Sequence, residues 1–151
     1  MNVDRRVDLL FLTRNRLAFT RESFTTLLAN TDWDHVRELV IMDDGSVDGT
    51  LEWLQGHMDQ APVPARLLRT RFNSPVAAMS AFIEQARAPI LAKIDNDVIV
   101  PPNWLSESLG VLDRYPELSL LGLEAIHPVG AAPDPERAYA VADFVSGLGL
   151  Y

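Results

Sequence analysis

The sequence predicts an α/β fold in which helices flank a mainly parallel, doubly wound sheet. Two observations lead to this prediction. Short apolar segments that suit buried strands alternate with segments of helical periodicity, at a spacing of about 25 to 30 residues. Polar clusters also follow three of the predicted strands, at the carboxyl ends where ligands bind on sheets of this class. The alternation implies right-handed crossover connections between parallel strands.

The first predicted strand covers residues 7–12, which are nearly all apolar and therefore suit a strand buried on both faces. A polar loop follows it at residues 13–16. The next helix is predicted to begin at a cap provided by Thr20 or Ser23 and to end at about Asn30. Its expected sheet-facing side chains are Phe24, Leu27 and Leu28.

Two further strands are predicted at residues 38–42 and 65–69. Between them, a helix begins at an Asp48 cap and stops before Pro62. Its apolar side chains are Leu51, Trp53, Leu54 and Met58. The helix after the third strand is expected to begin with Ser74 as its cap and a proline in its first turn. Its expected apolar face consists of Val76, Met79, Phe82 and Ile83.

A fourth strand is predicted at residues 89–94, and residues 98–100 are expected to continue in an extended conformation. The Pro101-Pro102 pair then opens a helix. Its apolar residues are Trp104, Leu105, Leu109 and Leu112. A fifth strand is expected at residues 119–122, and residues 141–151 have the pattern of a strand interrupted by glycines.

The composition limits the partners that the chain can bind. We expect a single domain over residues 1–151, with 48% hydrophobic and 23% charged residues, as in ordinary globular proteins. A net charge of −8 argues against a nucleic-acid partner, and an anionic ligand would need local cations. Cysteine is absent, which excludes disulfides and thiolate chemistry. No segment has the ~18 apolar residues of a transmembrane helix, so we expect a cytoplasmic domain.

Asp43 and Asp44 are adjacent carboxylates after a predicted buried strand, and their repulsion calls for a hydrogen-bond donor, a cation or solvent. A carboxylate there could accept from the imide N–H of uracil or from a ribose hydroxyl. The alternative is an ordinary Asp-Gly-Ser turn before the Asp48 cap. A calcium loop of the EF-hand type is disfavoured, because Gln55 stands where that loop needs a glutamate.

Asp95-Asn96-Asp97 places two carboxylates two residues apart, so in an extended strand they would project on the same side. Carboxylate oxygens suit Mg²⁺ or Mn²⁺, which commonly takes one or two protein carboxylates together with phosphate oxygens and water. The alternative is a solvated turn between two short strands. The position of this motif at a carboxyl strand end favours the metal interpretation.

With these motifs the chain resembles the family 2 glycosyltransferases, inverting enzymes with the GT-A fold, over most of residues 7–151. The resemblance rests on three stretches, which are Thr13-Arg14-Asn15-Arg16, Met42-Asp43-Asp44-Gly45-Ser46-Val47-Asp48-Gly49-Thr50, and Lys93-Ile94-Asp95-Asn96-Asp97 with the following Pro101-Pro102-Asn103-Trp104-Leu105. It implies binding of a nucleotide-diphosphate sugar donor and transfer of the sugar to a hydroxyl acceptor.

The same resemblance implies roles for individual residues. Those expected to hold the nucleotide are Thr13, Arg16, Asp43 and Asp44, with Asp44 as the contact to the base. Asp95 would face the ribose or the diphosphate. Asp97 would ligate Mn²⁺ or Mg²⁺, which stabilises the negative charge on the departing nucleoside diphosphate.

One departure from the family lies near the third helix, where the family often has an Asn-x-Gly entry and a later Arg or Asn. This chain has Pro75, Ser80 and Ala81 there. Arg69 or Arg71 could supply the missing donor contact. The alternative is that both are ordinary surface arginines.

A second departure concerns the general base that an inverting enzyme needs, which stays unassigned. Residues 144–151 resemble the strand before the acidic motif that supplies this base in the family, so the acceptor and base region is expected to be missing. Available carboxylates without a matching context are Asp134, Glu136 and Asp143, and His127 has the context of a structural residue.

The leading hypothesis is therefore the donor-binding domain of a metal-dependent glycosyltransferase. The missing base keeps a non-catalytic module, which either binds a sugar nucleotide or serves in assembly, as the alternative. A sugar nucleotidyltransferase is a weaker alternative, because the loop at residues 13–16 lacks the glycines of a phosphate loop.

Overall fold

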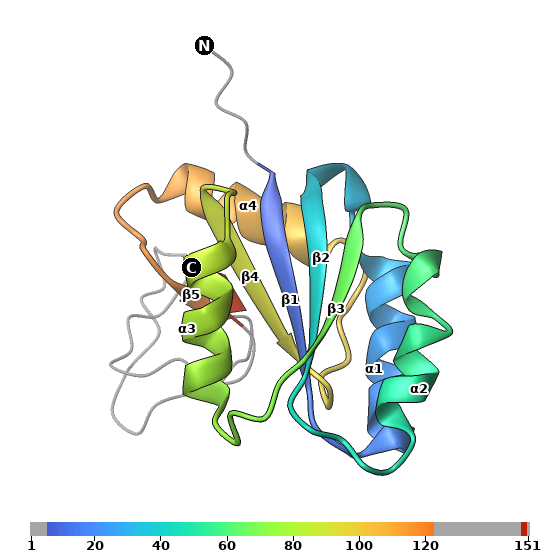
Figure 1. Cartoon of the computed structure of the whole chain (residues 1–151). Coiled ribbons are helices and arrows are strands. Elements are labelled where there is room, and N and C mark those ends of the chain that lie inside the picture. Colours follow the sequence, from blue (N-terminus) through green and yellow to red (C-terminus); the bar gives the residue numbers. More distant parts are fainter. Residues whose placement is uncertain (1–5, 123–148, 151) are drawn as a thin grey trace, which may run out of the picture.

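A computed structural model of the chain describes residues 6–122 and 149–150. The strands are β1 (Val7–Thr13), β2 (Val36–Asp43), β3 (Ala65–Arg69), β4 (Ile90–Asp95), β5 (Leu121–Gly122) and β6 (Gly149–Leu150). The helices are α1 (Leu17–Asn30), α2 (Thr50–Gln55), α3 (Pro75–Gln85) and α4 (Trp104–Arg114), with short 3₁₀ turns at Trp33–His35 and Met58–Gln60. Figure 1 shows their arrangement.

The strands form one sheet in the order β3-β2-β1-β4-β6-β5. The four long strands β1 to β4 run parallel, and β6 pairs antiparallel with both β4 and β5. The predicted mainly parallel α/β sheet is thus confirmed. The strand order reverses at β1, because β2 lies on one side of it and β4 on the other.

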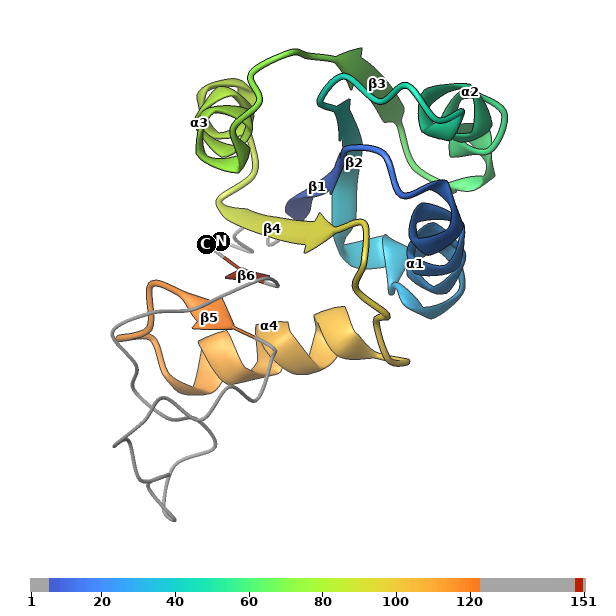
Figure 2. The ribbon, with the colours of Figure 1, turned by 90° about the horizontal axis from the view of Figure 1, so that it is seen from below.

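Helices cover both faces of the sheet (Figure 2). Every residue of β1 is buried, as predicted for a strand with two covered faces. Helices α1, α2 and α4 pack on the face that includes Leu9, Phe11 and Ile41. Helix α3 covers the other face, formed by Leu10, Leu12, Val40 and Met42.

Helix α1 begins at Leu17, three residues before the earlier of the two predicted caps. Thr20 and Ser23 are buried within the helix instead of capping it. The reason is tertiary, because the Leu17 amide donates to the Asp48 carboxylate at 3.0 Å. Asp48 also accepts from the Thr50 amide at 3.1 Å at the start of α2, but the N-cap residue is Gly49, so the predicted cap is one residue off.

Three other predictions need correction. Helix α3 begins with a Ser74 cap as predicted, but it buries Ala78 and Phe82, whereas Val76 is 75% exposed and Ile83 51% exposed. Helix α2 ends at Gln55 and is followed by a 3₁₀ turn, so it is shorter than predicted. Residues 98–100 form no strand. Within the described residues, no helix is long and apolar enough to cross a membrane.

Candidate functional site

The register of the parallel strands brings the predicted polar clusters together at one edge of the sheet. Thr13 at the end of β1 is the pairing partner of Asp43 at the end of β2. On the other side of β1, Asp95 at the end of β4 pairs with Leu12. Arg69 at the end of β3 pairs with Asp43. The clusters therefore meet at the carboxyl ends of β1 and β4, where the strand order reverses and where ligands bind on such sheets.

Asp43 is fully buried at the end of β2. Its Oδ1 accepts a hydrogen bond from the Ser46 amide at 3.0 Å, which closes the Asp-Gly-Ser turn. Its Oδ2 is buried and has no hydrogen-bond partner among the described residues. An unsatisfied buried carboxylate oxygen costs about 1–3 kcal/mol or more, which makes it a feature that a ligand or water would relieve.

Asp44 connects the turn after β2 to the loop after β3. Its Oδ1 accepts from the Thr70 hydroxyl at 3.0 Å and from the Phe72 amide at 2.6 Å. In the described part of the chain, no donor reaches its Oδ2, which leaves that oxygen for a ligand. Phe72, whose backbone amide donates to Oδ1, is 44% exposed. The sequence analysis missed both Thr70 and Phe72, because nothing in their local sequence marks them.

The loop after β1 is tied to the turn after β2. The Asn15 amide donates to the Ser46 hydroxyl at 2.7 Å, and the Asn15 side chain accepts from the Val47 amide at 2.9 Å. Asn15 and Arg16 both have left-handed backbone conformations, with φ of 55° and 62°. Two such non-glycine residues in succession are strained, and this type of strain is concentrated at functional sites.

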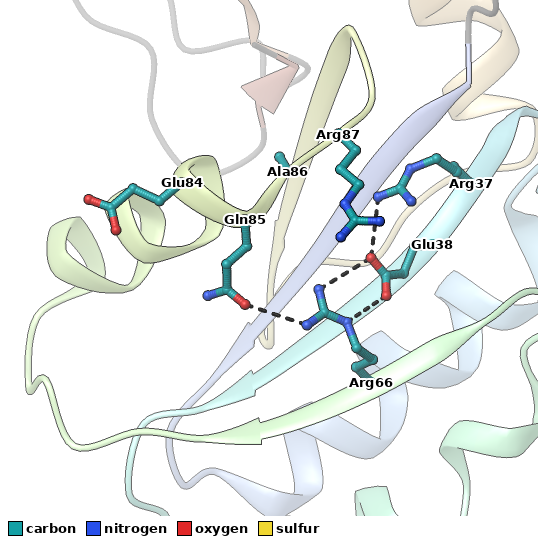
Figure 3. A pocket seen from close by; sticks show the side chains of 7 residues that line it. All are labelled: Arg37, Glu38, Arg66, Glu84, Gln85, Ala86 and Arg87. Carbon is teal, nitrogen blue, oxygen red and sulfur yellow. Dashed lines mark hydrogen bonds and ion pairs between the residues drawn. The ribbon is translucent and has the colours of Figure 1, made fainter.

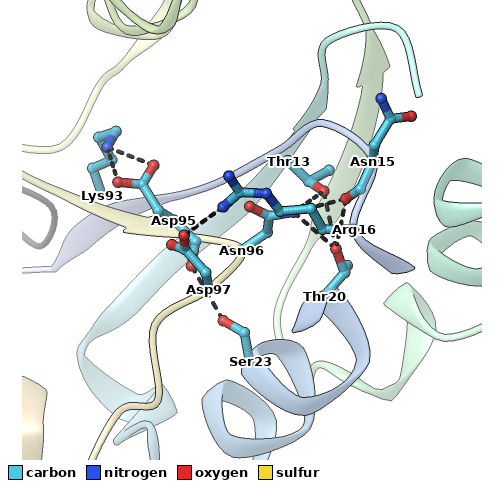
Figure 4. A network of polar contacts seen from close by, with 9 residues as sticks. All are labelled: Thr13, Asn15, Arg16, Thr20, Ser23, Lys93, Asp95, Asn96 and Asp97. Carbon is cyan, nitrogen blue, oxygen red and sulfur yellow. Dashed lines mark hydrogen bonds and ion pairs between the residues drawn. The ribbon is translucent and has the colours of Figure 1, made fainter. Parts of the chain in front are cut away.

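Asn96, the middle residue of the Asp-Asn-Asp motif, holds β4 to this loop (Figure 4). Its amide nitrogen lies 3.1 Å from the Thr13 hydroxyl, 2.9 Å from the Asn15 carbonyl and 3.0 Å from the Thr20 hydroxyl. Thr13 is only 1% exposed, so its hydroxyl serves this internal network. The sequence marked Asn96 only as a spacer between two carboxylates, and it missed this role.

Both carboxylates of the motif already face a cation. Lys93 Nζ lies 2.6 Å from each oxygen of Asp95. Burial raises the pKa of Asp95 above its ordinary value, against the lowering effect of the Lys93 ammonium. Asp97 Oδ2 accepts from the Arg16 guanidinium at 2.8 Å, and these two side chains are 44% and 61% exposed. The predicted nucleotide residue and the predicted metal ligand are thus direct neighbours.

The donor atoms here fit a divalent cation that binds together with phosphate. The described residues contain no group of three acidic or histidine side chains that could cage a metal alone. Such a cage is not required, since Mg²⁺ is usually held by one or two carboxylates and completed by substrate phosphates and water. Asp97 meets this need, because its side chain is partly exposed and Oδ1 has no partner among the described residues.

Arg69 at the end of β3 and Arg71 in the loop after it lie beside the Asp43–Asp44 turn. A Cβ built at Gly45 would lie 3.8 Å from Arg71 Cγ, and the Thr70 amide donates to the Asp43 carbonyl at 2.8 Å. Arg69 and Arg71 are both exposed. Their location agrees with a role in donor binding. The base candidates Asp134, Glu136 and Asp143, as well as His127, lie outside the described residues.

A polar hollow of about 520 Å³ lies at the opposite edge of the sheet, near the amino ends of the strands (Figure 3). Its lining residues are Arg37, Glu38, Arg66, Glu84, Gln85, Ala86 and Arg87. Glu38 accepts from Arg66 at 2.5 Å and from Arg37 at 3.3 Å. Both oxygens of Glu38 at the centre of the hollow are thus paired with arginines, in contrast to the unpaired carboxylate oxygens at the carboxyl edge.

Sequence comparisons place the chain among known proteins. The family described as Glycosyl transferase family 2 matches residues 9–128. The uncharacterized protein y4gI of Sinorhizobium fredii is 31% identical over 82% of this chain and 14% of its own length. The dodecaprenyl-phosphate galacturonate synthase of Rhizobium johnstonii is 32% identical over 62% of this chain and 28% of its own length.

Solved structures show the same fold. The mannosyltransferase PcManGT of Pyrobaculum calidifontis, solved with GDP-Man and Mn²⁺, matches 78% of this chain and 34% of its own chain, with a TM-score of 0.68 and 19% identity. TarS of S. aureus, solved with UDP-GlcNAc, matches 78% and 33%, with a TM-score of 0.64 and 18% identity. These are GT-A glycosyltransferases, which confirms the predicted fold. The chain spans about a third or less of each protein's length.

Proposed function

Because the chain belongs to glycosyl transferase family 2, we propose that it is the donor-binding part of a glycosyltransferase that depends on Mn²⁺ or Mg²⁺. The donor is a nucleotide-diphosphate sugar, and the acceptor is a hydroxyl group. The single domain over residues 1–151 and its cytoplasmic location are parts of the same proposal.

One observation above all supports this proposal. Asp43, Asp44 and Asp97 each have one oxygen that receives no hydrogen bond from the described residues, and all three lie at the same edge of the sheet, at the reversal of strand order. Unpaired acceptors at that edge suit a ligand that brings N–H and O–H donors together with a metal. A purely structural turn would be expected to satisfy its own carboxylates.

The proposed roles follow from these positions. Asp44 Oδ2 accepts a hydrogen bond from the base, and the exposed ring of Phe72 gives the base an apolar surface to stack on. Asp43 lies deeper and accepts from the nucleoside. Thr13 acts through Asn96, as a positioning residue for the loop at residues 13–16.

Asp95 and Asp97 serve the diphosphate side of the donor. Asp97 would hold the divalent cation, and Asp95, neutralised by Lys93, would face the ribose or the diphosphate. When bound, the cation stabilises the negative charge that develops on the departing nucleoside diphosphate. Arg16 supplies a guanidinium next to the same position, and it is a suitable partner for phosphate oxygens.

Calorimetric titration of the purified chain with UDP- and GDP-sugars tests the proposal. We expect binding with Mn²⁺ or Mg²⁺ and none with a chelator. Asp97→Asn should remove the metal-dependent binding, whereas Asp34→Asn, an equal change at an exposed position in a 3₁₀ turn, should not. If neither nucleotide sugar binds in the presence of metal, the proposal is wrong. Binding without transfer or donor hydrolysis would favour the non-catalytic module.

A further inference from the structure

The proposed metal ligand already has a cationic partner within the protein. The guanidinium of Arg16 lies 2.8 Å from Asp97 Oδ2, across 81 positions of the sequence. Figure 4 shows the Arg16 side chain reaching over the end of β4 toward that carboxylate. A divalent cation on Asp97 would therefore be a second cation at a carboxylate whose charge Arg16 already neutralises.

The backbone holds Arg16 in this position. Arg16 is the N-cap residue of α1 in a left-handed conformation, with φ 62° and ψ 48°. For a residue other than glycine this conformation costs about 1–2 kcal/mol. The next residue, Leu17, is fixed by the bond from its amide to Asp48, and the preceding Asn15 is bonded to Ser46. Arg16 is thus a strained residue between two anchored neighbours, and its contact with Asp97 belongs to this built loop.

Two cations then compete for one carboxylate. Without a donor, a metal on Asp97 repels Arg16 and leaves it without a described anionic partner, so the metal binds at a cost. With a nucleoside diphosphate present, the guanidinium gains phosphate oxygens as new partners, and the cost disappears. The diphosphate thus accepts both cations.

We infer that Arg16 is a placeholder for the metal on Asp97, and that its transfer to the diphosphate makes binding of metal and donor cooperative. This inference rests on the proposed function of the same site. Since coupling between two ligands is reciprocal, the metal raises the affinity for the donor by the same factor as the donor raises the affinity for the metal. Arg16 acts here as a positioning and binding residue.

The loop also contains a matched control. Arg14 is an exposed arginine two residues before Arg16, and its guanidinium contacts the neutral side chain of Asn73. Arg14→Asn and Arg16→Asn remove the same charge from the same loop, but only the second vacates Asp97. Asparagine also tolerates the left-handed conformation at position 16, so Arg16→Asn keeps the backbone. Circular dichroism and thermal melting establish that both variants are folded.

The test is a titration of the full chain with Mn²⁺, with and without saturating UDP or GDP. Electron paramagnetic resonance of the free Mn²⁺ ion measures how much of the metal is bound. Without nucleotide, Arg16→Asn should bind Mn²⁺ about two- to fivefold more tightly than the wild type, because an exposed ion pair is removed. Arg14→Asn should change this affinity by less. With nucleotide, the gain of Arg16→Asn should vanish or reverse.

The outcomes separate the two proposals. If Arg16→Asn binds Mn²⁺ no more tightly than the wild type in the absence of nucleotide, the placeholder role is wrong, whatever the nucleotide does. Adding Asp97→Asn to Arg16→Asn should abolish the gain, and a gain that persists would also contradict the inference. Failure of the proposed function has a different signature, which is that the wild type binds neither UDP nor GDP even with Mn²⁺.

Discussion

Charged side chains gather at both edges of the parallel sheet, yet the two edges differ in how their carboxylates are satisfied. At the amino edge, both oxygens of Asp8 and both oxygens of Glu38 accept hydrogen bonds from arginines. At the carboxyl edge, Asp43, Asp44 and Asp97 each keep an oxygen that no described residue reaches. The comparison teaches that the pairing of each oxygen, more than the number of charges, distinguishes a structural cluster from a candidate binding site.

Asp8 at the amino edge is a carboxylate with both oxygens hydrogen-bonded within the protein. The side chain is 1% exposed and lies opposite Arg37, which donates to both oxygens at 2.6 Å. Oδ2 also accepts from the amides of Arg87 and Ala88, which join β1 to the chain before β4. Such a carboxylate has no oxygen left for a ligand, and its bonds tie β1 to β2 and to the chain before β4.

The largest predicted effect is therefore on stability at the amino edge. Asp8→Asn leaves Arg37 partly buried without its carboxylate, and we expect a loss of about 2–4 kcal/mol in the free energy of unfolding. Urea denaturation monitored by circular dichroism measures this loss. The affinity for nucleotide and Mn²⁺ should stay unchanged in the folded fraction. A lower affinity of folded Asp8→Asn for the donor would contradict the conclusion that the amino edge is structural and the carboxyl edge binds the ligand.

The second prediction concerns the carboxyl edge, where carboxylate oxygens remain unpaired. Asp44→Asn keeps an oxygen for Thr70 and Phe72 but replaces the free carboxylate oxygen with an amide group. We expect the affinity for UDP or GDP to fall about ten- to hundredfold, because a hydrogen bond to a charged acceptor is lost. The melting temperature should change little. Calorimetry measures the affinity, with Asp34→Asn as the matched control, and equal affinities of the two variants would exclude Asp44 as a base contact.

How much the sequence could predict also differs between the two edges. The apolar runs of β1, β3 and β4 located these strands to within one residue at either end. The motifs Asp43–Asp44 and Asp95–Asp97 were visible because these polar residues come directly after the apolar runs of β2 and β4. At the amino edge, Asp8, Arg37 and Arg66 carried no signal, since their partners lie 28 or 29 positions away and no motif joins them.

The features that were missed at the carboxyl edge have the same cause, which is that their contacts come from residues distant in the sequence. The cap of α1 comes from Asp48 in another loop, so local sequence placed the helix start at Thr20 or Ser23. The buried face of α3 is set by the sheet below it, and periodicity alone could not choose Ala78 over Val76. Asn96 looked like a spacer, because its three acceptors lie on β1, α1 and the loop between them.

The third prediction uses Asn96 to couple both kinds of effect. Asn96→Ala removes the donor that holds Thr13, Asn15 and Thr20, and we expect a loss of about 1–2 kcal/mol in stability. Because the loop at residues 13–16 loses its anchor, its amides should exchange hydrogen faster, and Mn²⁺ affinity should change with it. Hydrogen exchange measured by mass spectrometry should show no such acceleration around Asp8. Equal acceleration at both edges would mean that Asn96 supports the whole sheet.

The smallest predicted effect is a pH dependence of opposite sign at the two edges. At Asp8, burial raises the pKa, but the hydrogen bonds from Arg37 and from the amides of Arg87 and Ala88 outweigh it, so the pKa lies below its ordinary value of 3.8. Its stabilising contribution is complete above that value and is lost as the pH falls below it. At Asp95, burial dominates and the pKa is raised.

For Asp95 the sign therefore reverses, because the folded state holds the proton more tightly than the unfolded state. The free energy of unfolding of the wild type minus that of Asp95→Asn should become more positive as the pH falls through the raised pKa toward 3.8. The difference between the wild type and Asp8→Asn should instead shrink as the pH falls below 3.8. Urea titrations of the three proteins between about pH 3 and pH 7 measure both trends. If the two differences change in the same direction, the carboxylates at the two edges are not held in the contrasting environments described above.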